Sequence, residues 1–230
     1  MSFQLLLEAP GVGHGAFDAR VRRELVPRLN SLGPRVLRVA HTEAPPPRLA
    51  AVPFDRVPAA LFSVEAEDPA PYVEALAPQA GERLGAWRVT TTWPLAQERA
   101  WAAGARSPGV GLLSTFRRRR GIDPARFLER WHGGHTPLTL EVHPVVGYVR
   151  SVPSAPLVPG SAELHGIVEE RFARRVDLLD PRRFYGGAWR MVPNALRVAV
   201  DIAGFLDLGS VRSWLVAERR VREPQARREP

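Results

Sequence analysis

The chain has 230 residues, of which 45% are hydrophobic and 24% are charged, a composition typical of a globular protein and not of a disordered one. It has no cysteine, which excludes disulfides, thiolate metal sites and thiol nucleophiles. Its 32 basic side chains are all arginines and give a net charge of +8, but they are scattered and lack the interleaved aromatic residues that stack on bases. We therefore expect no nucleic-acid partner.

No apolar run approaches the length of a membrane span, so we expect no membrane partner. The segment MSFQLLLEAPGV at the start lacks the basic region of a secretory signal. Together with the absence of cysteine, these features favour a cytoplasmic protein.

The first half of the chain predicts six elements in the order strand, helix, strand, strand, helix, strand. Apolar and β-branched residues cluster in the strands, and Gly33-Pro34 ends the first helix. The expected ranges are 3–9, 17–32, 35–42, 59–66, 69–84 and 87–95.

The second half predicts the same order of elements. Asp123 and Pro124 mark the start of its first helix, as a cap and a first helical residue. Its second helical stretch is longer and contains prolines and a Gly-Gly pair, which predict a broken helix. The expected ranges are 109–118 for a strand, a helix from 124, 145–152 and 165–172 for strands, 177–207 for the broken helix and 211–220 for the last strand.

Residue identities support an internal repeat with an offset of 110 positions. The residues that recur at this offset are Phe17, Arg20, Pro27, Pro34, Val36, Val39 and Pro46, which match Phe127, Arg130, Pro137, Pro144, Val146, Val149 and Pro156. Repeated identities together with a repeated element order indicate two copies of one folding unit.

A βαββαβ unit folds as a four-stranded antiparallel sheet with both helices on one face. The other face must be buried, and two units can bury it against each other. The sequence therefore predicts an α+β protein of two tandem ferredoxin-like βαββαβ units. We expect domains at 1–106 and 107–221, followed by a polar, disordered tail at 222–230.

The most informative segment for function is 126–137, which follows the capped helix start. Phe127, Trp131 and His135 recur every four residues and share a helix face that should look into the protein. Gly133 and Gly134 have no side chains to occupy the space beside the imidazole, which leaves room for a ligand. An imidazole ordinarily titrates near neutral pH and can serve as a general acid or base. The plain alternative is a histidine packed in the core.

Other chemistries have weaker support. His132 and His135 with Glu129 do not reproduce the H-E-x-x-H arrangement of zinc sites, so we expect no metal. The chain has no G-x-S-x-G elbow of a serine hydrolase. The glycines at 11–15 lack the G-x-G-x-x-G fingerprint of dinucleotide binding.

The second half resembles the EthD family over about 109–221. The residues that carry the resemblance are Phe127, Trp131, His135 and Pro137, in the pattern F-x-x-x-W-x-x-x-H-x-P, and the strand Gly147-Tyr148-Val149 that follows. The first half resembles only the wider dimeric α/β-barrel (ferredoxin-like) superfamily, by element order. The resemblance implies that the two units form, within one chain, the barrel that relatives form as dimers.

The resemblance also implies a function and a site. The family's recurrent histidine falls on His135, as a general acid or base, with Trp131, His132, Tyr148 and Phe116 as substrate-binding residues. We expect a cofactor-independent lyase, cyclase or oxidoreductase that acts on a small apolar, aromatic or polyketide-like molecule, in a monomer or homodimer. The alternatives are a non-catalytic binding or accessory protein and a haem-binding member with His135 as the ligand. The insertion at 173–208 is expected to reshape or cover the cleft.

Overall fold

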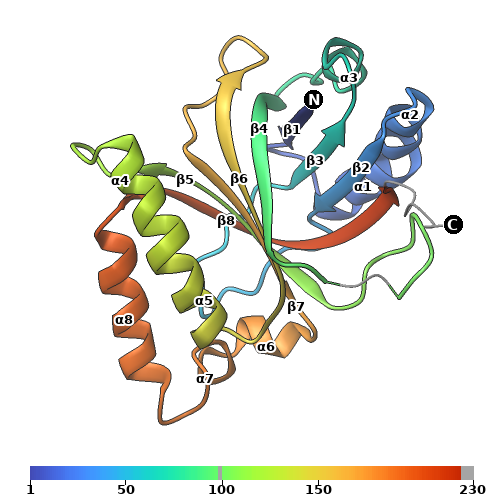
Figure 1. Ribbon diagram of the computed structural model, residues 1–230. Coiled ribbons are helices and arrows are strands. Elements are labelled where there is room, and N and C mark those ends of the chain that lie inside the picture. The colour runs from blue at the N-terminus through green and yellow to red at the C-terminus, as the bar shows by residue number, and fades with distance from the viewer. Residues whose placement is uncertain (98–99, 224–230) are drawn as a thin grey trace, which may run out of the picture.

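A computed structural model describes residues 1–97 and 100–223 (Figure 1). Eight strands form one closed antiparallel barrel in the order β1-β3-β2-β8-β5-β7-β6-β4. The strands are β1 Ser2–Glu8, β2 Val36–His41, β3 Ala59–Glu65, β4 Arg83–Leu95, β5 Val110–Arg118, β6 Val145–Pro156, β7 Gly166–Phe172 and β8 Leu206–Arg222.

Helices cover the outside of the barrel. Figure 1 shows α1 to α3 on one side and α4, α5 and α8 on the other. They are α1 His14–Arg20, α2 Val26–Ser31, α3 Ala70–Ala75, α4 Pro124–Glu129, α5 Thr136–Val142, α6 Arg175–Leu179, α7 Pro181–Phe184 and α8 Met191–Ala203, with π-helical turns η1 Val21–Leu25 and η2 Arg130–His135. In the described part of the chain, no helix has the length and hydropathy of a membrane span.

Each half of the chain supplies four consecutive strands of the barrel, which confirms the predicted pair of βαββαβ units. Within each half, the first and third strands are central and the second and fourth are at the edges. The edges of the two halves join, because β2 pairs with β8 and β4 pairs with β6. The closed barrel therefore has no free strand edge among these eight strands.

The first helix of each unit contains a π-helical turn, which the sequence pattern did not predict. The amide of Val26 donates to the carbonyl of Val21, and that of Thr136 donates to the carbonyl of Trp131, five residues back in both cases. The next residue is a proline in both helices, which has no N–H to continue the ladder. The wider turn thus lies just before the position where an α-helical hydrogen bond is lost.

Two sequence predictions differ from the structure in extent. The helix expected at 69–84 ends at Ala75, because Pro78 follows and Gly81 has a φ of 84°, which a helix cannot accommodate. The broken helix expected at 177–207 is present as the three helices α6, α7 and α8, which run from Arg175 to Ala203. Arg222, expected in the tail, is the last residue of β8, and 224–230 lie outside the described residues.

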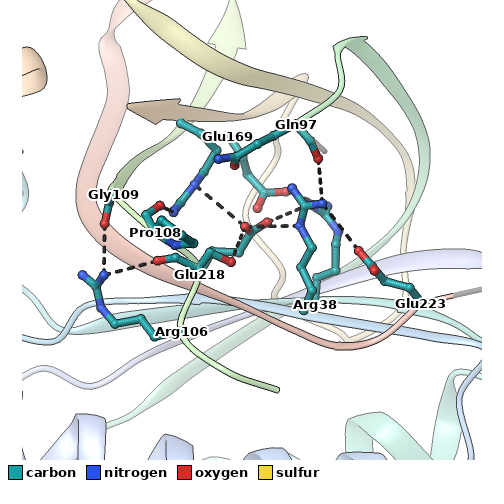
Figure 2. Close-up of polar contacts among 11 residues, drawn as sticks. Arg38, Gln97, Arg106, Pro108, Gly109, Glu169, Glu218 and Glu223 are labelled. Carbon is teal, nitrogen blue, oxygen red and sulfur yellow. Dashed lines mark hydrogen bonds and ion pairs between the residues drawn. The ribbon is translucent and has the colours of Figure 1, made fainter. Parts of the chain in front are cut away.

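The barrel interior is divided into an apolar and a polar region. The apolar region is a cluster that includes Trp87 from the first half and Trp214 from the second. In the polar region, Arg38 Nη2 donates to Glu169 Oε1 at 3.0 Å, and Arg38 Nη1 lies 3.5 Å from Glu218 Oε1 (Figure 2). Since Arg38 lies on β2 and both carboxylates lie in the second half, these buried ion pairs connect the two units.

Candidate active site

The candidate site has an aromatic wall between β5 and the helix α4–η2–α5. The indole of Trp131 is fully buried and meets the ring of Phe116 edge-on, with ring centroids 5.0 Å apart. Phe127 packs on the same indole at 5.7 Å. This packing depends on Gly166 at the start of β7, because a Cβ there would overlap both Phe116 and Trp131.

A cavity of about 340 Å³ lies against this wall. Its apolar lining comes from the outer face of the second-half strands and from α8, with Val198, Ile202 and Phe205 among the lining residues. Phe184 and Tyr185 add to it from the insertion, and the loop 51–53 reaches it from the first half. A cavity of this size and lining suits a small apolar or aromatic ligand.

His135 lines the cavity and pairs with a carboxylate from the insertion. Its Nδ1 lies 2.7 Å from Asp201 Oδ2, and its Nε2 lies 3.3 Å from Thr139 Oγ1. The histidine side chain is 15% exposed, so it is not an enclosed core histidine. Because the carboxylate accepts the Nδ1 proton, the neutral imidazole carries its lone pair on Nε2.

Tyr148 and Glu170 lie opposite each other on β6 and β7 and both line the cavity. Burial raises the pKa of Glu170 to about 8. Its Oε2 has no hydrogen-bond partner within residues 1–97 and 100–223. Burial, followed by the charge of Glu170, raises the pKa of the Tyr148 phenol well above its usual value.

His143, from the end of helix α5, is another buried titratable group at the cavity. Its Nδ1 donates to the carbonyl of Phe184 at 2.8 Å. Burial lowers its pKa to about 4, against the smaller opposing effect of that hydrogen bond. The ring is therefore neutral near pH 7, with its acceptor lone pair on Nε2.

Four of the five residues singled out in the sequence meet at this cavity, namely Phe116, Trp131, His135 and Tyr148. His132 does not line it, although it was expected to bind substrate. Its ring packs against Trp131, with centroids 4.9 Å apart, and burial and the charge of Arg150 lower its pKa. The physical reason is its place in the helix, since His132 directly follows Trp131 and successive side chains of a helix project in different directions.

Sequence reasoning missed Asp201, Glu170 and His143. Asp201 is 66 residues from His135 and lies in the insertion. Glu170 had a weak signal, because the run Glu169-Glu170-Arg171 interrupts a strand whose other residues are apolar or glycine. Adjacent charges in a strand point to opposite faces, so one of the two glutamates had to face the helices.

Within residues 1–97, the helix face of the first half that corresponds to the site carries apolar side chains. At the offset of 110, Val21 and Leu25 take the places of Trp131 and His135, and both are buried in an apolar core. The two halves therefore differ in the side chains that line the equivalent helix face.

One group of three side chains in the described part lies close enough together to share a metal ion, namely Asp18, His41 and Glu43. The carboxylates are also paired with arginines, since Arg22 contacts Asp18 at 3.0 Å and Arg106 contacts Glu43 at 3.0 Å. These contacts make the group an ion-pair cluster on the first half, away from the cavity lining.

The haem alternative does not fit His135 as the resemblance would place it. An iron would bind Nε2, since Nδ1 pairs with Asp201. Thr139 Oγ1 lies 3.3 Å from that nitrogen and would have to move away before an iron could bind there.

Comparison with protein-family models gives no match, and comparison with curated proteins gives none either. Among solved structures, a "putative monooxygenase" from Lactobacillus acidophilus is similar, with 9% identity, a TM-score of 0.52 and coverage of 96% of this chain and 97% of that one. Another protein described in the same words, from Fusobacterium nucleatum, has 6% identity, a TM-score of 0.50 and coverage of 96% and 92%. The fold is a dimeric α/β-barrel. In this chain both units of that barrel come from one polypeptide.

Proposed function

We propose that this dimeric α/β-barrel protein is an EthD-like enzyme that acts on a small apolar, aromatic or polyketide-like molecule without a cofactor. The observation that supports this most is the His135–Asp201 pair, 2.7 Å apart, at the edge of an apolar cavity of about 340 Å³. A carboxylate that orients an imidazole is a common arrangement for a general base. The apolar lining favours binding of an apolar ligand, and the imidazole accepts or donates the proton in the reaction.

The proposed chemistry begins with removal of a proton next to a carbonyl. His135 accepts that proton on Nε2, while Asp201 holds Nδ1–H and stabilises the imidazolium that forms. Elimination or cyclisation of the resulting enolate would make the protein a lyase or a cyclase. In a decarboxylase the C–C bond to the carboxylate would break instead, carbon dioxide would leave, and the imidazolium form of His135 would protonate the enolate that remains. An oxidoreductase, in line with the descriptions of the two structural neighbours, would start from the same enolate and would need molecular oxygen as the acceptor of its electrons.

The second candidate is a non-catalytic binding or accessory protein. It is favoured by the contact of His135 Nε2 with Thr139 Oγ1 at 3.3 Å, which gives the imidazole a partner on each nitrogen without any ligand. In that case His135 would anchor a ligand or the helix and would transfer no proton.

The variant His135→Ala tests the site. We expect it to abolish turnover of enolisable aromatic ketones, or to weaken their binding, with little loss of stability, because the side chain lies at a cavity edge. Leu25→Ala is the matched control in the other half. Leu25 is 1% exposed, so its truncation should lower the free energy of unfolding by about 2–5 kcal/mol.

Melting curves of both variants, measured beside ligand binding and a pH–rate profile, decide between the candidates. If His135→Gln still binds the ligand but its pH–rate profile lacks one of the slopes seen for the wild type, the result would support the enzyme hypothesis. Normal binding by an unstable His135→Ala protein would contradict the site assignment, because the histidine would then be a structural residue.

A further inference from the structure

Two of the buried polar groups that line the cavity are a phenol and a carboxyl on neighbouring strands. Tyr148 and Glu170 are register partners in the antiparallel pair β6–β7, so their side chains project from adjacent points on the same face of the barrel. Both residues are buried, with exposures of 1% and 9%. Both line the cavity into which His135 also faces.

The surroundings of Glu170 lack a protein partner for the carboxyl. Its register neighbour on the other side is Leu112, and its Oε2 has no hydrogen-bond partner among the described residues. The adjacent Glu169 faces the barrel interior and pairs with Arg38. A buried polar atom without a partner is rare in folded proteins and often marks a functional role.

Both groups hold a proton at neutral pH. Burial raises the pKa of Glu170 to about 8, so its neutral form, with one O–H donor, predominates at pH 7. The raised pKa of Tyr148 keeps the phenol protonated as well. Two O–H groups from adjacent strand positions therefore belong to the lining of one cavity whose other walls are mainly apolar, and the side chains of Trp131 and Thr136 lie within hydrogen-bonding reach of the phenol.

We infer that Tyr148 and Glu170 form a pair of hydrogen-bond donors for the oxygen of a carbonyl group, and that the ligand of this cavity is an apolar ketone or a related enolisable carbonyl compound. This inference rests on the proposed function and names its substrate class. A neutral acid at a buried position is an effective donor to an oxygen on which negative charge develops.

The pair complements the proposed proton transfer. When His135 removes a proton from the carbon next to the carbonyl, the C–H bond breaks and the proton goes to Nε2. The electron pair of that bond moves onto the carbonyl oxygen, which becomes an enolate. Tyr148 and Glu170 would donate to this oxygen and keep their own protons, so the step needs no oxidant and no further reactant.

The test uses two naphthalenes of similar shape as probes, 2-acetylnaphthalene and 2-ethylnaphthalene, with the full-length protein. The ketone has the carbonyl and the hydrocarbon lacks it. We expect both to bind the wild type, and we expect the infrared stretch of a ¹³C-labelled carbonyl to move to lower frequency in the complex. Tyr148→Phe and Glu170→Leu should each weaken ketone binding by about 2- to 10-fold and leave hydrocarbon binding unchanged.

Glu170→Gln is the control for folding, since it keeps the shape and an N–H donor. In the wild type, ketone affinity should fall as the pH rises through about 8, because the ionised carboxylate has lost its donor. In Glu170→Gln that decline should be absent. The other titratable groups on the cavity are Tyr148, His135, His143 and Tyr185, and the hydrocarbon probe reports any pH effect that does not involve the carbonyl.

The outcomes separate this inference from the proposed function. If the ketone and the hydrocarbon lose affinity equally in Glu170→Leu and Tyr148→Phe, or if neither variant changes ketone binding, the donor pair is refuted and the apolar site remains. If neither probe binds the wild type, the proposed ligand class fails, and the inference fails with it.

Discussion

Glu170 and His143 are neutral at one cavity for the same physical reason, but burial changes their pKa values in opposite directions. Burial disfavours the charged form of each group, so it raises the pKa of the acid and lowers the pKa of the base. Glu170 therefore destabilises the folded state as the pH rises, and His143 destabilises it as the pH falls. Glu170 and His143 are therefore both neutral between about pH 4 and about pH 8.

The effect of Glu170 on stability can be measured directly. In the unfolded chain its carboxyl ionises near pH 4.5, and in the folded protein near pH 8. Between these values the unfolded state loses the proton and the folded state retains it, so the free energy of unfolding falls with rising pH, by up to about 5 kcal/mol. Urea unfolding at pH 5 and pH 8 should show a smaller fall for Glu170→Gln than for the wild type.

Parallel declines in the wild type and Glu170→Gln would contradict the raised pKa. Comparison of the two proteins at each pH removes the contribution of all other groups, which they share. This measurement needs no ligand, so it tests the electrostatics of the cavity independently of its function.

At the scale of elements, the site depends on how closely β7 approaches the helix α4–η2–α5. Gly166 opens β7 directly beneath the rings of Phe116 and Trp131, and a methyl group there would overlap both. Aromatic rings packed on each other cannot move aside as a flexible side chain can. The strand must therefore start with glycine for the aromatic wall to form.

Gly166→Ala should lower the free energy of unfolding by about 1–3 kcal/mol and weaken ligand binding, because it overpacks the aromatic wall. Gly133→Ala is the matched control in the neighbouring helix. A Cβ at Gly133 meets no atom within 4 Å, and alanine favours a helix over glycine by up to about 1 kcal/mol. Thermal melts should therefore move in opposite directions, and a neutral Gly166→Ala would show that the wall can repack.

At the scale of the whole molecule, closure of the barrel makes the two halves depend on each other. The pairings β2–β8 and β4–β6 join their edges, and the apolar cluster around Trp87 and Trp214 fills the space between their inner faces. The buried ion pairs of Arg38 with Glu169 and Glu218 also cross this junction (Figure 2).

Fragments 1–106 and 107–222 should therefore not fold when each is expressed alone. Each would expose two strand edges, an apolar sheet face and unpaired charges that are buried in the intact barrel. Co-expression should restore a soluble complex. Two fragments that are separately soluble and melt cooperatively would contradict this mutual dependence, and calorimetry on the purified fragments is the decisive measurement.

Local pattern determined most of the fold and part of the site. Alternating and clustered apolar residues marked all eight strands, the offset of 110 marked the duplication, and the four-residue spacing of Phe127, Trp131 and His135 marked the inward helix face. The strand and helix-face patterns are short-range, because each depends on the periodicity of one element, and the duplication follows from comparing two segments of the same sequence.

Only the tertiary structure decided which distant groups meet. Asp201 reaches His135 because α8 packs against η2, and Glu170 faces the cavity because β7 lies between β5 and β6. The π-helical turns depend on backbone hydrogen bonds that reach five residues back, and the pattern of apolar residues in the sequence does not show this change of hydrogen bonding. Burial then set the protonation of Glu170 and His143, since a pKa depends on the surrounding dielectric, which only the folded chain creates.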